Sequence, residues 1–410
     1  MTILRKLTYL STLVLIFALP WEDSISIPGI GSLARLMGLV AAGFWAGTIL
    51  IEGRFRKPNL FHVLILLFFL WNFLTLFWSF DIESTIKRIK TYSQIFLLIL
   101  IYWEVFQKPE ELRAGLQAYI FGAYVLVGST VYNYLAGNVA VQYEGRYSAT
   151  GVNANDVALI LILCLPIALH LLLVAKNDIK RVLVQGLNYL YIPLSVFSSI
   201  LTGSRTSLIA IIPFVVYLIG TQRIQIERKI IMFFILLVLF LALLPFVPST
   251  VINRLGTIGD SISGADLGGR VMMWKKSIAV LDQYPILGVG SGAIDHTIGG
   301  AVHNTLLSVV SETGFIGLLL FLSIIGLVVY DVVRLPRETS ALWLAVFLTW
   351  VIGAISLSWE FRKVTWIILS FVIIESNYMN PIGVQVGKAS LSQGTRKSVR
   401  SGATAQPKEI

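Results

Sequence analysis

Charged residues are scarce in this sequence. Of its 410 residues only 13% are Asp, Glu, Lys or Arg, whereas 56% are hydrophobic, and the mean hydropathy is +0.80. Soluble domains carry roughly a quarter charged residues. The shortage of charge therefore excludes an ordinary soluble enzyme and predicts an all-α integral membrane protein.

Cysteine and metal-binding patterns are also nearly missing. Cys164 is the only cysteine, so the chain cannot form an internal disulfide, and its apolar surroundings indicate a packed, unreactive thiol. No Asp-x-Asp pair stands out in the loops that we expect to face outward. Such a pair often holds a divalent ion, so we expect metal-independent chemistry and no cofactor.

What the chain does contain is a series of long apolar runs. We predict about twelve transmembrane helices, because each run approaches the ~17–25 residues needed to span a bilayer. They lie near residues 7–20, 33–51, 60–80, 91–106, 114–135, 154–175, 183–201, 205–220, 229–247, 304–333, 339–357 and 362–378. The first run resembles a signal-peptide core, but no convincing cleavage site follows Pro20, so we expect a retained span.

The basic residues predict the orientation. The net charge is +10, but the Lys and Arg residues are scattered through short loops, which favours membrane lipids over nucleic acid as partners. The larger set of basic loops includes both chain ends, so both termini should be cytoplasmic. Helices 1–9 then occupy residues 1–247, an outward loop with active-site elements occupies 248–303, helices 10–12 occupy 304–378, and 379–410 form a flexible cytoplasmic tail.

His303 stands where the outward loop should enter the membrane. A histidine at such a boundary can reach water and titrate near neutral pH, so it can transfer protons. Alternatively, it is an interfacial residue that only hydrogen-bonds its neighbours. His296, in the same loop, is a weaker candidate for the proton-accepting base.

Glu312 lies nine residues after His303. If the helix between them is unbroken, Glu312 is on the opposite helix face from His303 and ~13 Å deeper in the membrane, so we expect it to bind a hydroxyl or amide on another span.

Two arginines depart from the positive-inside rule in informative places. Arg205 follows the tight turn at Gly203 and opens a helix, where backbone N–H groups and a guanidinium can bind phosphate. The alternative is that Arg205 extends its side chain to the lipid headgroups.

The sixth predicted span begins near residue 154, and Asn155 or Asp156 can cap this helix.

The second arginine, Arg270, opens a helix predicted to end near Asp282, after a Gly- and Ser-rich stretch at 257–269 that we expect to be flexible. Arg270, Trp274, Ile278 and Leu281 share one face. That face either lies on the outer membrane surface or places Arg270 over a cavity with Trp274 beneath it. Gly288 and Gly290 then let the backbone turn tightly and approach a ligand, although no dinucleotide fingerprint is present.

Several of these motifs follow one another in a recognisable order. They are Gly203-Ser204-Arg205 between two spans, Arg270 with Trp274, Pro285-Ile286-Leu287-Gly288-Val289-Gly290, and His303-Asn304 followed by Gly314 and Gly317. Together they resemble the signature of bacterial O-antigen ligases, whose superfamily includes O-antigen polymerases and protein O-oligosaccharyltransferases. The resemblance is concentrated between Arg205 and Gly317.

The resemblance implies a glycosyltransferase in the bacterial inner membrane. It would move a polysaccharide from undecaprenyl diphosphate to the lipid A–core oligosaccharide at the periplasmic face, with inversion. His303 would be the general base, and Arg205 and Arg270 would bind the diphosphate. Supporting or substrate-binding roles fall to Asn304, Trp274, Arg146, Gly288 and Gly290. Gly314 and Gly317 would allow close helix packing.

Three alternatives stay open from the sequence. An O-antigen polymerase or a protein O-oligosaccharyltransferase would use the same chemistry. A transporter of lipid-linked oligosaccharides would also suit a dozen spans, but it should show charged residues near mid-membrane in both halves of the chain. The cations of this sequence instead gather toward one face.

Overall fold

The computed structural model describes residues 2–29, 31–140, 145–174, 179–221, 224–256 and 269–379. Most of the Gly- and Ser-rich stretch, at 257–268, and the tail at 380–410 lie outside the described residues, so their expected flexibility stays a prediction.

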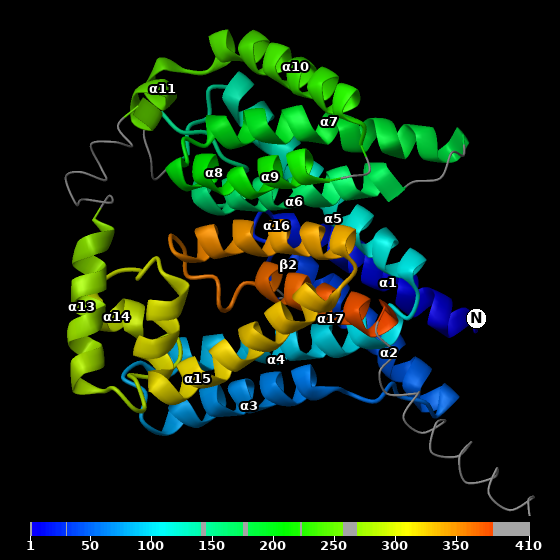
Figure 1. The fold of residues 1–410 in the computed structure, drawn as a ribbon. Helices are drawn as coiled ribbons and strands as arrows, with labels where there is room; N and C mark the ends of the chain where they lie inside the picture. The colour runs from blue at the N-terminus through cyan, green and yellow to red at the C-terminus, as the bar shows by residue number, and fades with distance from the viewer. Residues whose placement is uncertain are drawn as a thin grey trace, which may run out of the picture.

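Helices make up nearly all of the described chain (Figure 1). The amino-terminal half contains α1 (Ile3–Ala18), α2 (Leu33–Glu52), α3 (Leu60–Leu74), α4 (Ile82–Val105), α5 (Pro109–Leu135), α6 (Ala154–Val174) and α7 (Ile179–Leu201). It continues with α8 (Arg205–Ala210), α9 (Ile212–Gly220), α10 (Ile226–Leu243), α11 (Ser249–Gly256), α13 (Arg270–Gln283), α14 (Ile294–Ile298), α15 (Thr305–Arg334), α16 (Arg337–Ala354) and α17 (Lys363–Met379). The one described sheet is a two-stranded hairpin of β1 (Ser26–Ile27) and β2 (Gly31–Ser32).

Seven stretches among the described residues are long and apolar enough to cross a membrane. They are Ile3–Trp21, Leu33–Glu52, Leu60–Phe77, Pro109–Leu135, Ala154–Val174, Lys229–Phe246 and Thr305–Arg334. These spans and the helical content establish an all-α membrane protein. Each of the other predicted runs overlaps a helix as well, but the count of about twelve spans stays a prediction.

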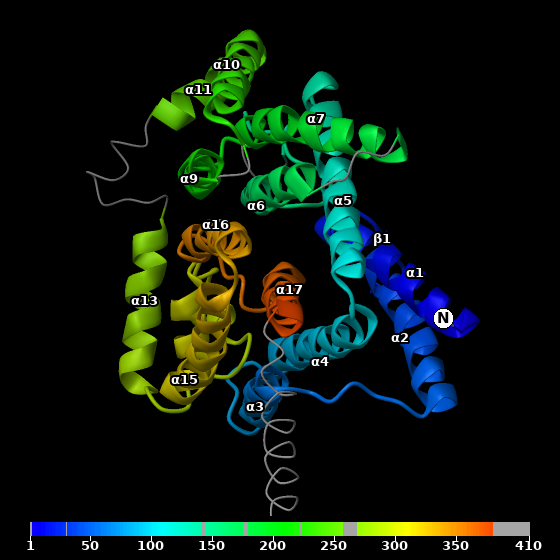
Figure 2. The same ribbon diagram turned by 45° about the vertical axis from the view of Figure 1, so that its right-hand side comes forward.

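Two helices form the centre of the molecule. Every residue from 156 to 171 of α6 and from 364 to 374 of α17 is buried. A helix that is apolar on all sides is stable in the protein interior, because it has no polar face that could contact water. Cys164 lies in the buried part of α6, as the sequence predicted. The remaining long helices surround these two, and α13 runs across the ends of the others (Figures 1 and 2).

The helix α15 is broken at Gly314, where φ is 66° and ψ is −174°. The structure shows that Gly314 interrupts the helix and allows a close approach of the 285–290 segment. An added Cβ would lie 1.9 Å from the Ile286 carbonyl oxygen, and positive φ is costly for other residue types. Gly317 fits packing better, because a Cβ there would lie 1.9 Å from Thr313 Oγ1 and 3.2 Å from Trp71 of α3.

The segment 285–290 fills the break in α15. The backbone N–H groups of Val289 and Gly290 donate to the carbonyls of Ser311 and Glu312 at 3.0 and 2.9 Å. In return, the Phe315 N–H donates to the Pro285 carbonyl at 2.8 Å. These bonds replace the helical ones lost at the break, which satisfies polar groups that would be costly in the membrane.

The two glycines of this segment serve the same junction. A Cβ on Gly288 would lie 2.4 Å from the Glu312 backbone, and one on Gly290 would lie 2.4 Å from Ser79 Oγ. Both glycines thus allow this segment to approach α15 and the chain before α4 closely. Their predicted approach to a ligand stays a prediction.

Candidate active site

His303 lies directly before α15, at the same end of the molecule as α13 and α14. Its φ of 54° makes it the only non-glycine residue with positive φ in the part of the chain that the structure describes. Such conformations cost of order 1–3 kcal/mol and persist where the surroundings enforce them. Residues on both sides are held by hydrogen bonds: Trp274 Nε1 donates to the Val302 carbonyl at 3.0 Å, and the Thr305 hydroxyl donates to the Leu357 carbonyl at 2.7 Å.

Charged groups from three helices act on the His303 imidazole. Burial lowers the pKa of His303, and the positive charge of Arg270 lowers this pKa further. The carboxylates of Asp295 and Asp156 act in the opposite direction without outweighing them. The pKa of His303 is therefore below its usual range, so the ring is neutral at pH 7 and can accept a proton.

Asn304 caps the helix that follows His303. Its side-chain oxygen accepts the backbone N–H of Leu307 at 3.0 Å, as an N-cap residue does. This bond fixes where α15 begins and therefore where His303 stands. The capping bond gives Asn304 a structural role at the site.

The helix α13 holds Arg270 and Trp274 beside His303. Its contact face differs from the predicted one: Ile278 is exposed, whereas Ser277 is buried and shares a 2.7 Å hydrogen bond with Ser311 of α15. Met273, Trp274 and Val280 pack against the buried Val289, Ile294 and Val302. The side of α13 that packs against protein is therefore centred on Ser277, and whether the predicted face meets the membrane surface or a cavity stays a prediction.

A second group of arginines surrounds the turn before α8. Arg205 Nε donates to the Arg254 carbonyl and Arg254 Nε donates to the Gly203 carbonyl, both at 3.2 Å. Arg146 is 1% exposed; its Nε donates to the Thr202 carbonyl at 2.6 Å and its guanidinium to Asn155 at 2.9 Å. Arg146 therefore braces the turn on which Arg205 stands.

The amino-terminal end of α6 connects the two groups. Asn155 binds Arg146, whereas the charge of the next residue, Asp156, acts on His303. The cap of α6 is neither of them: Asn153 Oδ1 accepts the Asn155 N–H at 2.8 Å, so the cap lies two or three residues before the predicted positions. Asp156 accepts instead from Trp359 Nε1 at 2.7 Å and from Arg362 at 2.8 Å.

A buried ion cluster lies behind the site. Arg88 of α4 contacts Glu360 at 2.9 Å and Glu312 of α15 at 3.4 Å, and its guanidinium lies 3.9 Å from the centre of the Phe361 ring. The expected partner of Glu312 was a hydroxyl or an amide; the structure places it against a guanidinium. Removing one member of such a cluster typically costs 3–5 kcal/mol, because the remaining charges stay buried.

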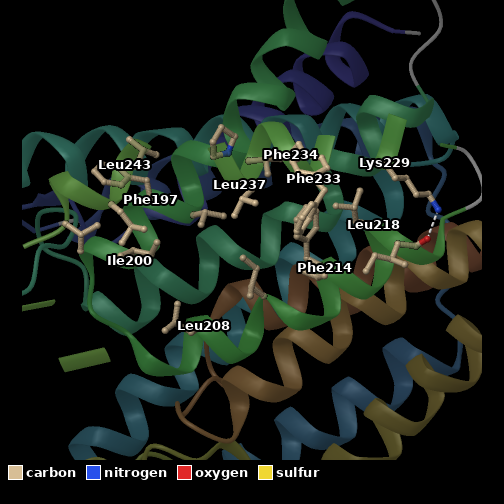
Figure 3. Close-up of a pocket in the computed structure, with 18 of the residues that line it drawn as sticks. Phe197, Ile200, Leu208, Phe214, Leu218, Lys229, Phe233, Phe234, Leu237 and Leu243 are labelled. Atoms are coloured by element: carbon tan, nitrogen blue, oxygen red, sulfur yellow. Dashed lines mark hydrogen bonds between the residues drawn. The ribbon is translucent and has the colours of Figure 1, made fainter. Parts of the chain in front are cut away.

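An apolar groove runs along the membrane part of α7, α9 and α10 (Figure 3). Its volume is about 870 Å³, and the lining includes Phe197, Leu208, Phe214, Val215, Phe233 and Leu237. One end reaches Ile252 and Gly256 of α11, the helix that also carries Arg254. The other end reaches Lys229, whose ammonium donates to the Ile219 carbonyl. An elongated apolar chain fits this shape and lining.

Comparison with known protein families identifies the middle of the chain. Residues 190–322 match the sequence model of the O-antigen ligase family. The chain carries an O-antigen ligase domain. A search of curated proteins gave no match to this chain. The O-antigen ligase domain extends from within α7 into α15, so it contains Arg205, Arg270 and His303, and the matched family consists of glycosyltransferase-like enzymes.

Several residues around the O-antigen ligase domain were not singled out as site residues from the sequence. Arg88, Asp156 and Glu360 lie outside residues 190–322, and Asp295 lies inside them. The sequence did contain one signal for Arg88: it lies in a region predicted to face outward, where the positive-inside rule disfavours arginine. Their meeting depends on contacts between residues more than 200 positions apart.

The described residues contain no group of three or more His, Cys, Asp and Glu side chains placed to hold a metal ion. The other two histidines, His62 and His170, are buried in α3 and α6.

Proposed function

We propose that this protein is a lipopolysaccharide O-antigen ligase. It transfers O-antigen polysaccharide from undecaprenyl diphosphate to the lipid A–core oligosaccharide at the periplasmic face of the inner membrane. The observation that carries the proposal is the O-antigen ligase domain at residues 190–322. It encloses a histidine with a lowered pKa and two arginines near one end of the helices.

The proposed reaction is a single displacement. The acceptor hydroxyl gives its proton to the neutral His303 imidazole while its oxygen forms a bond to the anomeric carbon. The bond from that carbon to the diphosphate oxygen breaks, and its electron pair leaves with undecaprenyl diphosphate. Attack from the face opposite the leaving group inverts the anomeric centre, and no metal ion is required.

The leaving diphosphate carries the charge that must be stabilised. Guanidinium groups suit a diphosphate, since they remain protonated and donate two parallel hydrogen bonds. We assign this role to Arg205 and Arg270, which carry permanent positive charge toward the same end of the helices as His303. The apolar groove between α7, α9 and α10 is proposed to hold part of the polyprenyl chain, with its α11 end nearest the headgroup.

The test is transfer by purified protein with polysaccharide-linked undecaprenyl diphosphate and three separate acceptors. Product on lipid A–core supports the ligase. Extension of a second lipid-linked saccharide would make the protein a polymerase, and glycosylation of an acceptor protein would make it an oligosaccharyltransferase. Movement of intact donor across vesicles without transfer would replace the enzyme with a transporter.

His303→Ala is the decisive variant for the mechanism. Proton removal by a positioned base typically contributes ~10²–10⁴-fold, so the single-turnover rate at saturating acceptor should fall by about that factor. Donor binding should change little, because the arginines and the groove remain. His296→Ala is the matched control, since His296 is exposed on α14 in the same region. A His303→Ala enzyme with the normal single-turnover rate would exclude His303 as the base.

A further inference from the structure

The hydroxyl of Thr305 makes two hydrogen bonds at the start of α15, just after His303. It donates to the Leu357 carbonyl at 2.7 Å and accepts the Trp359 backbone N–H at 2.9 Å. Because a hydroxyl both donates and accepts, the two bonds fix its rotation as well as its place. Thr305 is 0% exposed, so water cannot substitute for either partner.

The loop that Thr305 contacts, residues 355–362 between α16 and α17, is itself held by other helices. The Trp359 indole donates to the Asp156 carboxylate of α6 at 2.7 Å. The Trp359 carbonyl accepts from the Thr365 hydroxyl of α17 at 2.7 Å. Since the loop is fixed against both helices, it is a rigid anchor for Thr305.

The same loop contacts α15 one turn further along. The Ser308 hydroxyl donates to the Glu360 carboxylate at 3.0 Å, and this carboxylate pairs with Arg88 of α4 at 2.9 Å. Residues three apart lie on the same face of a helix, so Thr305 and Ser308 meet the loop from one face. The first turn of α15 is therefore fastened to the loop at two successive positions.

His303 lies between this anchor and a second one. On its other side, the Val302 carbonyl accepts from the Trp274 indole of α13 at 3.0 Å. The φ of His303 is 54°, a left-handed conformation that a non-glycine residue keeps only where its surroundings hold it. Relaxation to negative φ would displace residue 302 or residue 305 and break these bonds. The anchors therefore set the direction in which the imidazole leaves the backbone.

We propose that Thr305 is a positioning residue of His303: its hydroxyl holds the backbone in the conformation that directs the imidazole toward the acceptor hydroxyl. The inference rests on the proposed function, in which His303 is the base. Thr305 does not touch the reacting atoms and acts by fixing the residue that does. Placement matters, because a displacement of ~1 Å at a catalytic group can lower the rate by ~10²-fold.

Thr305→Val removes the hydroxyl while keeping the shape of the side chain. It should lower the single-turnover rate at saturating acceptor by ~10–10²-fold, with donor affinity unchanged, because the imidazole is no longer held in line. Thr305→Ser keeps the hydroxyl and should recover most of the rate. Thr313→Val is the matched control, since Thr313 is also buried in α15 but its hydroxyl donates to the Val309 carbonyl of the same helix at 2.6 Å. This control should have the wild-type rate.

A double-mutant cycle separates positioning from a general structural role. If Thr305 acts through His303, Thr305→Val should slow the wild-type enzyme but add no further loss in a His303→Ala background. An equal loss in both backgrounds would overturn the positioning role, and so would a normal rate in Thr305→Val. Should Thr305→Val fail to fold, Thr305→Ala takes its place in the same cycle.

The contact can also be tested without turnover. The chain has four histidines, so NMR with isotopically labelled histidine in detergent can identify the His303 resonance by its loss in His303→Ala. Thr305→Val should shift this resonance, whereas Thr313→Val should leave it in place. An unchanged resonance in Thr305→Val would overturn the proposal. A normal rate in His303→Ala would instead overturn the proposed base, and a shifted resonance would still show that Thr305 positions His303.

Discussion

At the residue scale, the least replaceable backbone position described above is Gly314. Its positive φ and the carbonyl of Ile286 beside it require the absence of a side chain, and three backbone hydrogen bonds surround the break. The break also separates the part of α15 that carries Glu312 from its apolar remainder. A single glycine thereby links the 285–290 segment to the helix that begins beside His303.

Gly314→Ala should destabilise the protein by roughly 2–5 kcal/mol, since it combines an unfavourable φ with a backbone collision. Gly326→Ala in the same helix is the control, because nothing lies within 4 Å of the added Cβ. This control should be neutral or slightly stabilising, as alanine favours helix over glycine by about 1 kcal/mol. Thermal unfolding in detergent compares the two. Equal Tm values for both variants would contradict the proposed need for the break.

At the scale of elements, the apolar groove lies between the helices α7, α9 and α10, and its existence depends on how these three helices are placed. Figure 3 shows the side chains of Phe197, Phe214 and Phe233 on its walls. Long grooves of this kind bind a flexible apolar chain through its buried area, at about 0.8 kcal/mol per CH₂. The polar ends of the ligand then decide its direction, and Arg205 and Arg254 lie toward the α11 end.

Val215→Trp should weaken donor binding, because Val215 lines the groove and a larger ring would occupy the space proposed for the polyprenyl chain. Val216→Trp is the matched control, one position further along α9, 63% exposed and not part of the lining. Binding of a labelled polyprenyl diphosphate measures both variants. If Val215→Trp binds this probe as well as Val216→Trp does, the groove does not hold the chain.

At the scale of the whole molecule, the charged contacts separate the two ends of the helices. Arg56 binds the Glu104 region together with Arg5 at one end, whereas Arg88, Arg146 and Arg362 gather at the other. The first end carries the loops predicted to be cytoplasmic. The proposed periplasmic site therefore requires that the end with His303 faces outward.

Cysteine labelling tests this orientation. Asp282→Cys, exposed at the end with α13, should react with an impermeant maleimide applied from the periplasm, whereas Glu110→Cys, exposed at the start of α5, should not. The background should be low, because the natural Cys164 is buried. The opposite labelling pattern would reverse the topology and move the candidate site to the cytoplasmic face.

The sequence by itself determined the membrane class, the helical runs and the order of the motifs. These depend on local composition and spacing. A long apolar run is unfavourable in water in any fold, and the position of Arg205 after its glycine turn is fixed by the sequence itself. It also indicated His303, because a histidine at a predicted membrane boundary is a local feature. The number of spans and the orientation remain predictions on the same basis.

Only the tertiary structure decided how distant residues meet. No periodicity relates Arg88 to Glu312 and Glu360, or Asp156 to Arg362, because contacts between remote segments depend on how whole helices pack. The role of Gly314 also changed once the structure showed the 285–290 segment filling the break, since a helix interruption requires other backbone groups to replace its lost hydrogen bonds.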